Sequence, residues 1–532
     1  MKKMKKIHKI YVLIMLGLFS LTFQSCKKDF DGIDDDPNQI TDKQLEADLQ
    51  IIGSKFKPVF ENIYEYSPLF QLQQNLNADI YGGYLTPPRP FRAGQNNNTY
   101  NLVGSWNNHI WVVAYSRVMN NLKKIEELKD YSNNFYAVSL ILKVEAMHRV
   151  SDIFGPIVYS NFGQSSTSST YDSQEEAYNQ FFADLDEAQN ILSQDIDGNK
   201  FTKFDMVYGG DYHKWMKFAN SLRLRLAIRI AMVDPAKAKL EGEKALANPE
   251  GLIESNSESF IVKGNLTHPL KTICCAWNDT RMNASLESFM RGYNDPRLPH
   301  YFKESTVSPG EIKGIRGGLP LMSNYTDELA QKADYVGFST IGDDIINSTY
   351  IQLMTAAEVW FLKAEAALRG WNGAGDAQTN YETGISKSFS QYGVGDAAPA
   401  YISDNTSTPM NYVDPVNNSN DINALTNVTI AWDNSASNEE KLEKIITQKW
   451  IAMFPEGMEA WSEFRRTGYP KLFPVVSNQS GGTIDTNIQI RRLPFVISEY
   501  STNPDGVQGA IQKLGGPDNG GTRLWWDTGS NF

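Results

Sequence analysis

The sequence predicts a predominantly α-helical protein, and three observations support this. Apolar residues recur at steps of three or four along several long stretches, which is the period of one face of an α-helix. Three of these stretches begin with a Ser or Thr three positions before a Glu or Gln, the pattern of a capping box, at Thr41, Ser173 and Ser437. The intervening stretches 252–350 and 391–436 are rich in Asn, Ser, Thr, Gly and Pro and predict long loops on a helical base.

The apolar stripes place the expected helices in chain order. They cover 41–63, 111–125, 136–150, 173–192, 215–226, 359–368 and 437–464, the last without a break. The stretch 356–389 mixes small and aromatic residues as tetratricopeptide helix pairs do, which predicts stacked helical hairpins. Arg223, Arg225 and Arg229 border the stripe at 215–226, so we expect them to bridge to acidic neighbours.

The N-terminus has the pattern of an export signal. Lysines precede an apolar run from Ile10 to Phe23, which is too short to span a bilayer. Ser25 and Cys26 follow, and a cysteine directly after a small residue predicts a bacterial lipoprotein in which Cys26 is acylated. The alternative is a plain secreted protein that is cut at another position.

Cleavage before Cys26 would give a signal peptide at 1–25, an acylated cysteine with a flexible acidic tether at 26–40, and one helical domain at 41–532. The full chain carries a formal charge of −12. Removal of 1–25 takes away five lysines and no acids, which leaves 45 basic and 62 acidic side chains and a formal charge of −17. Nucleic acid and anionic lipid headgroups are therefore poor partners for this chain, and we expect no nucleic-acid binding.

Cysteine usage predicts that burial, and not a disulfide framework, stabilises the exported chain. Besides Cys26 there are only Cys274 and Cys275, which are adjacent and cannot form a long-range bond. Two alternatives stay open for this pair. A vicinal disulfide would stiffen a turn beside Trp277, or the two residues are unpaired buried thiols.

No catalytic motif is convincing. The sequence has no metalloprotease helix, serine-hydrolase elbow or glycine-rich phosphate loop, and the five histidines after the signal are scattered, so we expect no metal and no cofactor. Asp527-Thr528-Gly529-Ser530 spells an aspartic-protease turn, but it occurs once in a helical protein. Some glutamates share helix faces, and we expect these to be solvated or paired with Lys363, Arg465 or Arg466: Glu358, Glu365, Glu456, Glu459 and Glu463.

Two segments interleave aromatic and polar residues as a ligand-binding surface would. One runs from Asp79 to Arg92 and the other from Cys274 to Arg281. Sugar rings have apolar faces and a hydroxyl rim, so flat aromatic side chains flanked by Asp, Asn and Arg suit carbohydrate. Peptide binding would use similar residues, and the alternative is that these aromatics belong to the core.

With these pieces in place, the chain resembles the SusD/RagB family of surface nutrient-binding lipoproteins of Bacteroidetes. The resemblance runs nearly end to end. It is carried by Cys26 with its acidic tether, Asp36-Pro37-Asn38, Arg149–Tyr159, Asp211–Arg225, Asn294–Leu298, Ala357–Ala366 and Arg491–Phe495.

This resemblance implies a SusD-like fold with four tetratricopeptide-like hairpins and no enzymatic activity. It also implies an outer-membrane, lipid-anchored, surface-exposed protein that binds a nutrient, foremost an oligosaccharide and alternatively a peptide. The ligand would pass to a SusC-like TonB-dependent transporter. By position, the two interleaved segments match the loops from which relatives build their ligand site, which nominates Asp79, Tyr81, Tyr84, Arg89, Trp277 and Arg281. Two rival functions are a glycan-degrading surface enzyme and a pure assembly role.

Overall fold

The computed structural model describes residues 49–89, 91, 96–165, 169–264, 267–320, 335–348 and 350–532. The chain divides into two units, residues 1–51 and residues 52–532, and only residues 49–51 of the first unit are described. The predicted signal peptide, Cys26, the predicted tether and the capping pattern at Thr41 therefore lie outside the described residues. Every element from α4 to α22 belongs to the second unit.

The described chain is mostly helical, as predicted. The helices are α3 Gln50–Gly53, α4 Phe56–Ile63, α5 Ala78–Tyr81, α6 Gly104–Val113, α7 Asn120–Glu127, α8 Asn133–Phe154, α9 Gln174–Leu192, α10 Tyr212–Arg229, α11 Pro235–Leu246, α12 Ala284–Gly292, α13 Leu298–Tyr301, α15 Asp343–Ile346, α16 Ala356–Leu368, α17 Ala377–Gln391, α18 Ala398–Ile402, α19 Asn438–Met453, α20 Gly457–Thr467, α21 Ile497–Thr502 and α22 Pro504–Leu514. Three π-helical turns are η1 Gln71–Asn75, η3 Ala114–Met119 and η7 Lys271–Ala276.

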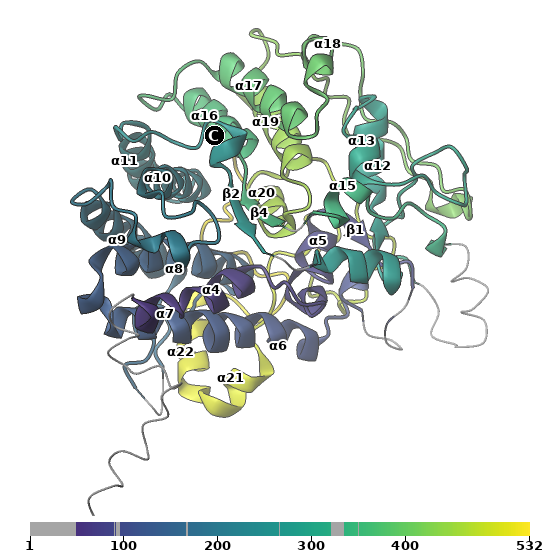
Figure 1. Cartoon of the computed structure of the whole chain (residues 1–532). Helices are drawn as coiled ribbons and strands as arrows, with labels where there is room; N and C mark the ends of the chain where they lie inside the picture. The colour runs from purple at the N-terminus through teal and green to yellow at the C-terminus, as the bar shows by residue number, and fades with distance from the viewer. Residues whose placement is uncertain are drawn as a thin grey trace, which may run out of the picture. The chain divides into compact units, whose positions relative to one another are not determined.

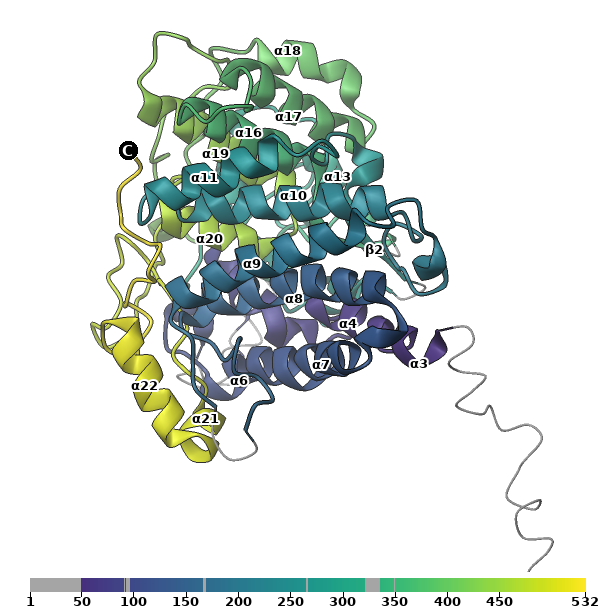
Figure 2. The same ribbon diagram turned by 90° about the vertical axis from the view of Figure 1, so that its left-hand side faces the viewer.

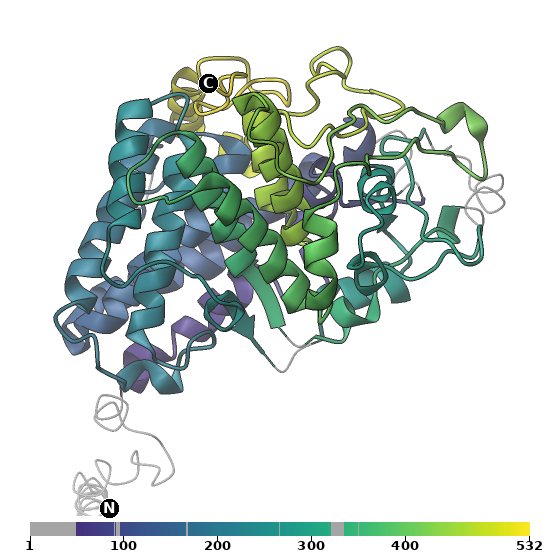
Figure 3. The same cartoon turned by 90° about the horizontal axis from the view of Figure 1, so that it is seen from above.

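Consecutive long helices of the second unit pack on one another in chain order. Helix α8 packs against α9, α9 against α10, α10 against α11 and α16, and α16 against α17, and Figure 2 shows them as successive layers. The loop-rich part that carries α12 and α13 lies on the other side of α16 and α19 from α10 and α11 (Figures 1 and 3). This arrangement confirms loops on a helical base, while the likeness to tetratricopeptide hairpins stays a prediction beyond the pairing itself.

Short strands tie the loop-rich part together. Strands β1 Leu85–Thr86 and β3 Arg281–Met282 form one antiparallel pair, and β2 Phe260–Lys263 and β4 Tyr350–Met354 form another. Each pair joins segments that lie far apart in the sequence, so the loops between helices are fixed by backbone hydrogen bonds as well as by packing.

The helix ends confirm two predicted capping boxes and contradict one predicted helix. The capping boxes at Ser173 and Ser437 are confirmed, each with a Glu side chain that closes back on the cap. The expected unbroken helix from 437 to 464 is wrong, because the chain stops α19 at Met453 and restarts as α20 after Pro455. Proline has no backbone N–H and its ring clashes with the preceding turn, so it breaks a helix even where the apolar period continues.

A network of buried charges holds the centre of the second unit. It joins α8, α10, α16, α19 and α20 through side chains within 4 Å of an opposite charge. Its acids are Glu145, Asp152, Glu358, Glu365, Glu456, Glu459 and Glu463, and its bases are His148, Arg149, Arg225, Arg229, Arg369, Lys449 and Arg466. All except Arg369 are buried. The equal numbers of acids and bases matter, because an unpaired charge in a protein interior is costly.

Arginines of α10 supply two of the bases of this network, as predicted from the sequence. Arg225 holds Glu358 with two parallel hydrogen bonds of 2.8 Å. Arg229 pairs with Glu459 at 2.5 Å and with Glu463 at 2.8 Å. The bridging role expected of these side chains is therefore confirmed. The glutamates that share helix faces are buried and not solvated. Glu365 and Glu463 pair with Arg466, which is one of the partners expected from the sequence.

Asp79 on α5 lies at the edge of this network and is fully buried. Its Oδ1 accepts a hydrogen bond from Gln74 Nε2 at 2.8 Å, and its Oδ2 accepts one from Asn75 Nδ2 at 3.1 Å. Gln74 in turn accepts from Arg149 at 3.0 Å. Burial raises the pKa of Asp79 to about 7, although the two amides and Arg149 lower it. The carboxyl group is thus poised to hold a proton near neutral pH.

We predict that Arg225→Met is strongly destabilising. The change leaves Glu358 buried without its two-bond partner, and breaking a buried pair from one side costs about 3–5 kcal/mol of unfolding free energy. Urea unfolding followed by circular dichroism measures the loss. Lys239→Met is the matched control, since it removes an exposed i,i+4 partner of Glu243 on α11 and should leave the midpoint nearly unchanged. Equal losses in the two variants would contradict a structural role for the network.

We also predict a pH-dependent effect of Asp79→Asn. The folded pKa of about 7 lies above the ordinary 3.8, so between these values the native state keeps a proton that the unfolded state has lost. The contribution of Asp79 to stability therefore falls as pH rises, at up to about 1.4 kcal/mol per pH unit. The variant cannot titrate, and Asn75 can turn its unpartnered Oδ1 toward the new amide.

The stability difference between variant and wild type should then grow in favour of the variant from pH 4 to pH 7 and level off above pH 7. Urea unfolding at each pH measures this difference. A difference that does not change with pH would show that Asp79 titrates normally.

Candidate functional site

The two aromatic–polar segments, which are distant in sequence, meet in a small antiparallel ladder. Leu85 of β1 pairs with Met282 of β3, and Thr86 pairs with Arg281. A third segment joins them, because Gln71 of η1 donates a hydrogen bond to Asp279 Oδ2 at 2.8 Å. The structure thus gathers η1, the chain around β1, and the turn between η7 and β3 into one surface.

Trp277 is the exposed aromatic residue of this surface. It follows η7 directly, and its backbone N–H donates to the Thr272 carbonyl at 2.9 Å, which closes the turn. Its side chain is 43% exposed, although indoles are usually mostly buried. A large flat ring that is left open to solvent can stack on a sugar ring or another planar group.

Arg281 positions this turn, and most of the N–H groups of its guanidinium donate to other groups of the protein. Its guanidinium donates to the carbonyls of Val336 and Cys274, both at 2.8 Å, and to Asn278 Oδ1 at 2.7 Å. Asn278 has a φ of 59°, a left-handed conformation that asparagine tolerates better than most residues. Burial lowers the pKa of Arg281. The structure therefore gives Arg281 the role of fixing the Trp277 turn.

Arg89 and Asp279 supply a donor and an acceptor in the same region. Arg89 Nε is buried and has no hydrogen-bond partner among the described residues. Burial raises the pKa of Asp279, while the hydrogen bond from Gln71 and the charges of Arg89 and Arg281 lower it. A buried donor without a partner is costly. Arg89 as a residue is partly exposed, so its other guanidinium nitrogens could donate to a ligand oxygen, and the Asp279 carboxylate could accept from a ligand hydroxyl or amide.

Asp79, Tyr81 and Tyr84 lie in the interior instead. They are 0%, 3% and 0% exposed. The Tyr84 hydroxyl donates to the Trp450 carbonyl at 2.5 Å and its ring stacks on the Trp450 ring, while the Tyr81 ring packs on Trp461 at 5.0 Å. Ligand contact at these three positions has no support in this structure. Their observed role is to hold the segment that carries Arg89 against α19 and α20.

The structure has Cys274 and Cys275 as two free thiols, which agrees with the unpaired alternative, but only Cys274 is buried and Cys275 is partly exposed. Cys274 Sγ lies 3.2 Å from the Thr280 hydroxyl, and Cys275 Sγ lies 3.7 Å from the Thr340 hydroxyl. Burial raises the pKa of the Cys274 thiol to about 12. A thiol with such a high pKa is a poor nucleophile, so Cys274 gives the site no reactive group.

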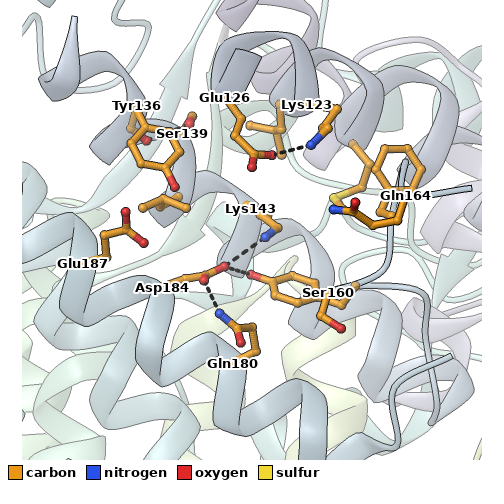
Figure 4. A pocket seen from close by; sticks show the side chains of 15 residues that line it. Lys123, Glu126, Tyr136, Ser139, Lys143, Ser160, Gln164, Gln180, Asp184 and Glu187 are labelled. Carbon is orange, nitrogen blue, oxygen red and sulfur yellow. Dashed lines mark hydrogen bonds and ion pairs between the residues drawn. The ribbon is translucent and has the colours of Figure 1, made fainter. Parts of the chain in front are cut away.

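A cavity of about 270 Å³ between α7, α8, α9 and residues 159–164 was not predicted (Figure 4). Its central acid, Asp184, accepts hydrogen bonds from Tyr159 at 2.6 Å, Gln180 at 2.7 Å and Lys143 at 3.1 Å. These groups satisfy one another and tie the loop to the helices. The sequence carried no signal for this cavity, because its lining comes from three helix faces that meet only in the folded chain.

Two features of the described residues concern a metal site and the protease-like tetrapeptide. Among them, no cluster of three or more His, Cys, Asp or Glu side chains could hold a metal ion. The carboxylate of Asp527, from the protease-like tetrapeptide, is held by Arg491 and Arg523. In the same part of the chain, no helix is both long and apolar enough to cross a bilayer.

Comparison with known proteins agrees with this architecture. Residues 32–527 match the SusD-like family, described as SusD and RagB outer membrane lipoprotein. A chitin-binding SusD homologue from Flavobacterium johnsoniae is 50% identical, with a TM-score of 0.87 over 90% of this chain and 99% of that one. No curated protein sequence matches the chain.

Two further solved structures show the same fold. A SusD homologue from Bacteroides vulgatus is 41% identical, with a TM-score of 0.84 over 92% of this chain and 100% of that one. One from Bacteroides uniformis is 38% identical, with a TM-score of 0.82 over 90% and 99%. Because the family match spans nearly all of the sequence and the relatives are covered end to end, this chain belongs to the SusD-like family of outer-membrane lipoproteins.

Proposed function

We propose that this protein binds chitin-type oligosaccharides, which are chains of β-linked N-acetylglucosamine, and passes them to a SusC-like TonB-dependent transporter in the outer membrane. The observation that carries the proposal is the 50% identity, over 90% of the chain, to a chitin-binding SusD homologue. Relatives this similar keep their fold, but function resides in the site, so the site must be able to recognise such a ligand.

The surface around Trp277 supports a neutral, amide-bearing sugar. N-acetylglucosamine offers an apolar ring face for the exposed indole. Its acetamide carbonyl could accept from the partly exposed Arg89 guanidinium, and its N–H or hydroxyl groups could donate to Asp279. Arg89 and Asp279 carry opposite charges, so this surface needs no charged ligand.

Capture without turnover is part of the proposal. Glycoside hydrolysis needs two carboxyl groups facing each other across the bond that breaks. Within the described part of this surface, Asp279 is the one partly exposed carboxylate, and the glutamates that share helix faces are buried in ion pairs. The described surface therefore has a binding acceptor but lacks an acid and nucleophile pair.

The anchor would place this surface outside the cell. In the proposal, residues 1–25 direct export and are removed, Cys26 is acylated, and residues 26–40 tether the domain at 41–532 to the outer membrane. A flexible tether leaves the domain free to deliver ligand to the transporter, so the protein can work by binding alone.

We predict that Trp277→Ala weakens chitooligosaccharide binding about tenfold, because ring stacking contributes on the order of 1 kcal/mol beyond the area buried. Calorimetric titration of the purified mature protein with chitohexaose measures the dissociation constant. Tyr131→Ala is the matched control, since Tyr131 is 41% exposed but lies outside this surface, and it should bind like wild type. Tight binding that survives Trp277→Ala would move the site elsewhere. No binding by folded wild type would refute chitin as the ligand.

We predict that Cys26→Ser releases the protein from the membrane. Without the thiol no acyl chain can attach, and the described helices offer no apolar span that would replace it. Membrane fractionation with labelled palmitate measures the anchor. Ser25→Ala, which keeps a small residue before the cysteine, should still be labelled and remain in the membrane fraction. Full membrane retention of Cys26→Ser would overturn the lipoprotein assignment.

A further inference from the structure

A second cavity lies at the C-terminal end of α20 and shares no residue with the surface around Trp277. Its volume is about 410 Å³. It is enclosed by residues 464–468 at the end of α20, by 471–472, by 487–491 and by the C-terminal segment 523–531. Small-molecule sites in proteins typically occupy about 300–1,000 Å³, so a monosaccharide-sized ligand fits this space.

The charge of the lining is opposite to that of the protein. Five cationic side chains line the cavity: Arg465, Arg466, Lys471, Arg491 and Arg523. Among its described lining residues, Glu439 is the one acid. The chain as a whole carries a formal charge of −12. Such a local reversal of charge attracts anions into the cavity.

Neighbouring carboxylates compensate only part of this charge. Arg466 holds Glu365 and Glu463, each at 2.7 Å, and is fully paired. Arg491 and Arg523, however, share the single carboxylate of Asp527, at 2.7 Å and 2.5 Å. One acid between two guanidinium groups leaves a positive charge in excess on this side of the cavity.

Arg465 and Lys471 add to the excess. Arg465 is fully buried and donates to the carbonyls of Asp152 and Arg491 and to other neutral groups, and no carboxylate pairs with it in the described chain. Burial lowers its pKa to about 9. The Lys471 ammonium lies 4.2 Å from the centre of the Tyr469 ring and has no ion pair among the described residues.

The remaining walls could accept the body of a sugar. Phe464 and Leu472 are apolar and buried, and Ile488 is partly exposed. Asn487 and Asn531 add amide groups at the same cavity. Apolar walls, amides and uncompensated cations together match a molecule with one carboxylate, several hydroxyls and an apolar ring face.

We propose that this cavity binds a sugar acid, a uronic-acid-type monosaccharide unit whose carboxylate is held by Lys471 and Arg523. Arginine can hold a carboxylate through two parallel hydrogen bonds, and Arg523 Nη2 and Nε are not used by Asp527. Its side chain is 38% exposed, so a ligand that enters from solvent can reach it. The site differs in charge from the neutral-sugar surface and would recognise a different part of a mixed glycan.

The test compares two probes that differ only at one carbon. The mature protein, purified with its anchor in detergent, is titrated calorimetrically with D-glucuronate and with D-glucose at low salt. We expect saturable binding of glucuronate, none of glucose, and a clear loss of affinity at high salt because the contact is ionic. Lys471→Gln and Arg523→Gln should each weaken glucuronate binding about tenfold.

Lys239→Gln on α11 is the matched control, since it removes an exposed lysine that does not line the cavity and should bind like wild type. Chitohexaose binding by Lys471→Gln should equal that of wild type, which separates this proposal from the one above. Equal responses to glucuronate and glucose, or glucuronate binding unchanged in both variants, would overturn the proposal. Binding of an N-acetylated dipeptide carboxylate in place of glucuronate would overturn the sugar-acid identity.

Discussion

The buried network of paired charges is the constraint on which the rest of this structure depends. It brings residues of α8, α10, α16, α19 and α20 to one place, and its seven acids and seven bases allow a charge-rich interior to exist at all. Apolar packing alone would let these helices slide, because it is not directional. Two-bond pairs such as Arg225 with Glu358 fix the helices in both distance and rotation.

The same network helps to position the surface around Trp277 that we propose binds ligand. Arg149 holds Glu456 just before α20 and also reaches Asp79 through Gln74, so α5 is attached to the charged core. The chain then passes from α5 into β1, and β1 pairs with β3 beside the Trp277 turn. A binding side chain on a loop needs structural support from the rest of the fold. Here the support has two parts: α5 is attached to the buried ion pairs through Asp79 and Gln74, and β1, which follows α5, is hydrogen-bonded to β3 beside Trp277.

Much of the fold could be predicted from the sequence, because helix periodicity and capping are local. The capping box at Ser173 and the bridging arginines of α10 were correct for this reason. The candidate site was harder. Tyr84 and Trp277 read alike in the sequence, yet one stacks on Trp450 and the other is open to solvent, and only tertiary packing separates them. Pro455 indicates a helix break in the sequence, but the apolar period continues on both sides of it and favours a single helix, which the structure does not have.

Helix geometry explains why two differently charged regions arise from one element. Consecutive residues of an α-helix point about 100° apart, so Arg465 and Arg466 on α20 have different partners although both line this cavity. Arg466 enters the core and is neutralised by Glu365 and Glu463. Arg465 faces the C-terminal segment, where Asp527 is already occupied by two other arginines. The charge of Arg466 is thus balanced by carboxylates, whereas that of its neighbour Arg465 is not. This excess positive charge makes the cavity at the end of α20 electropositive in an acidic protein.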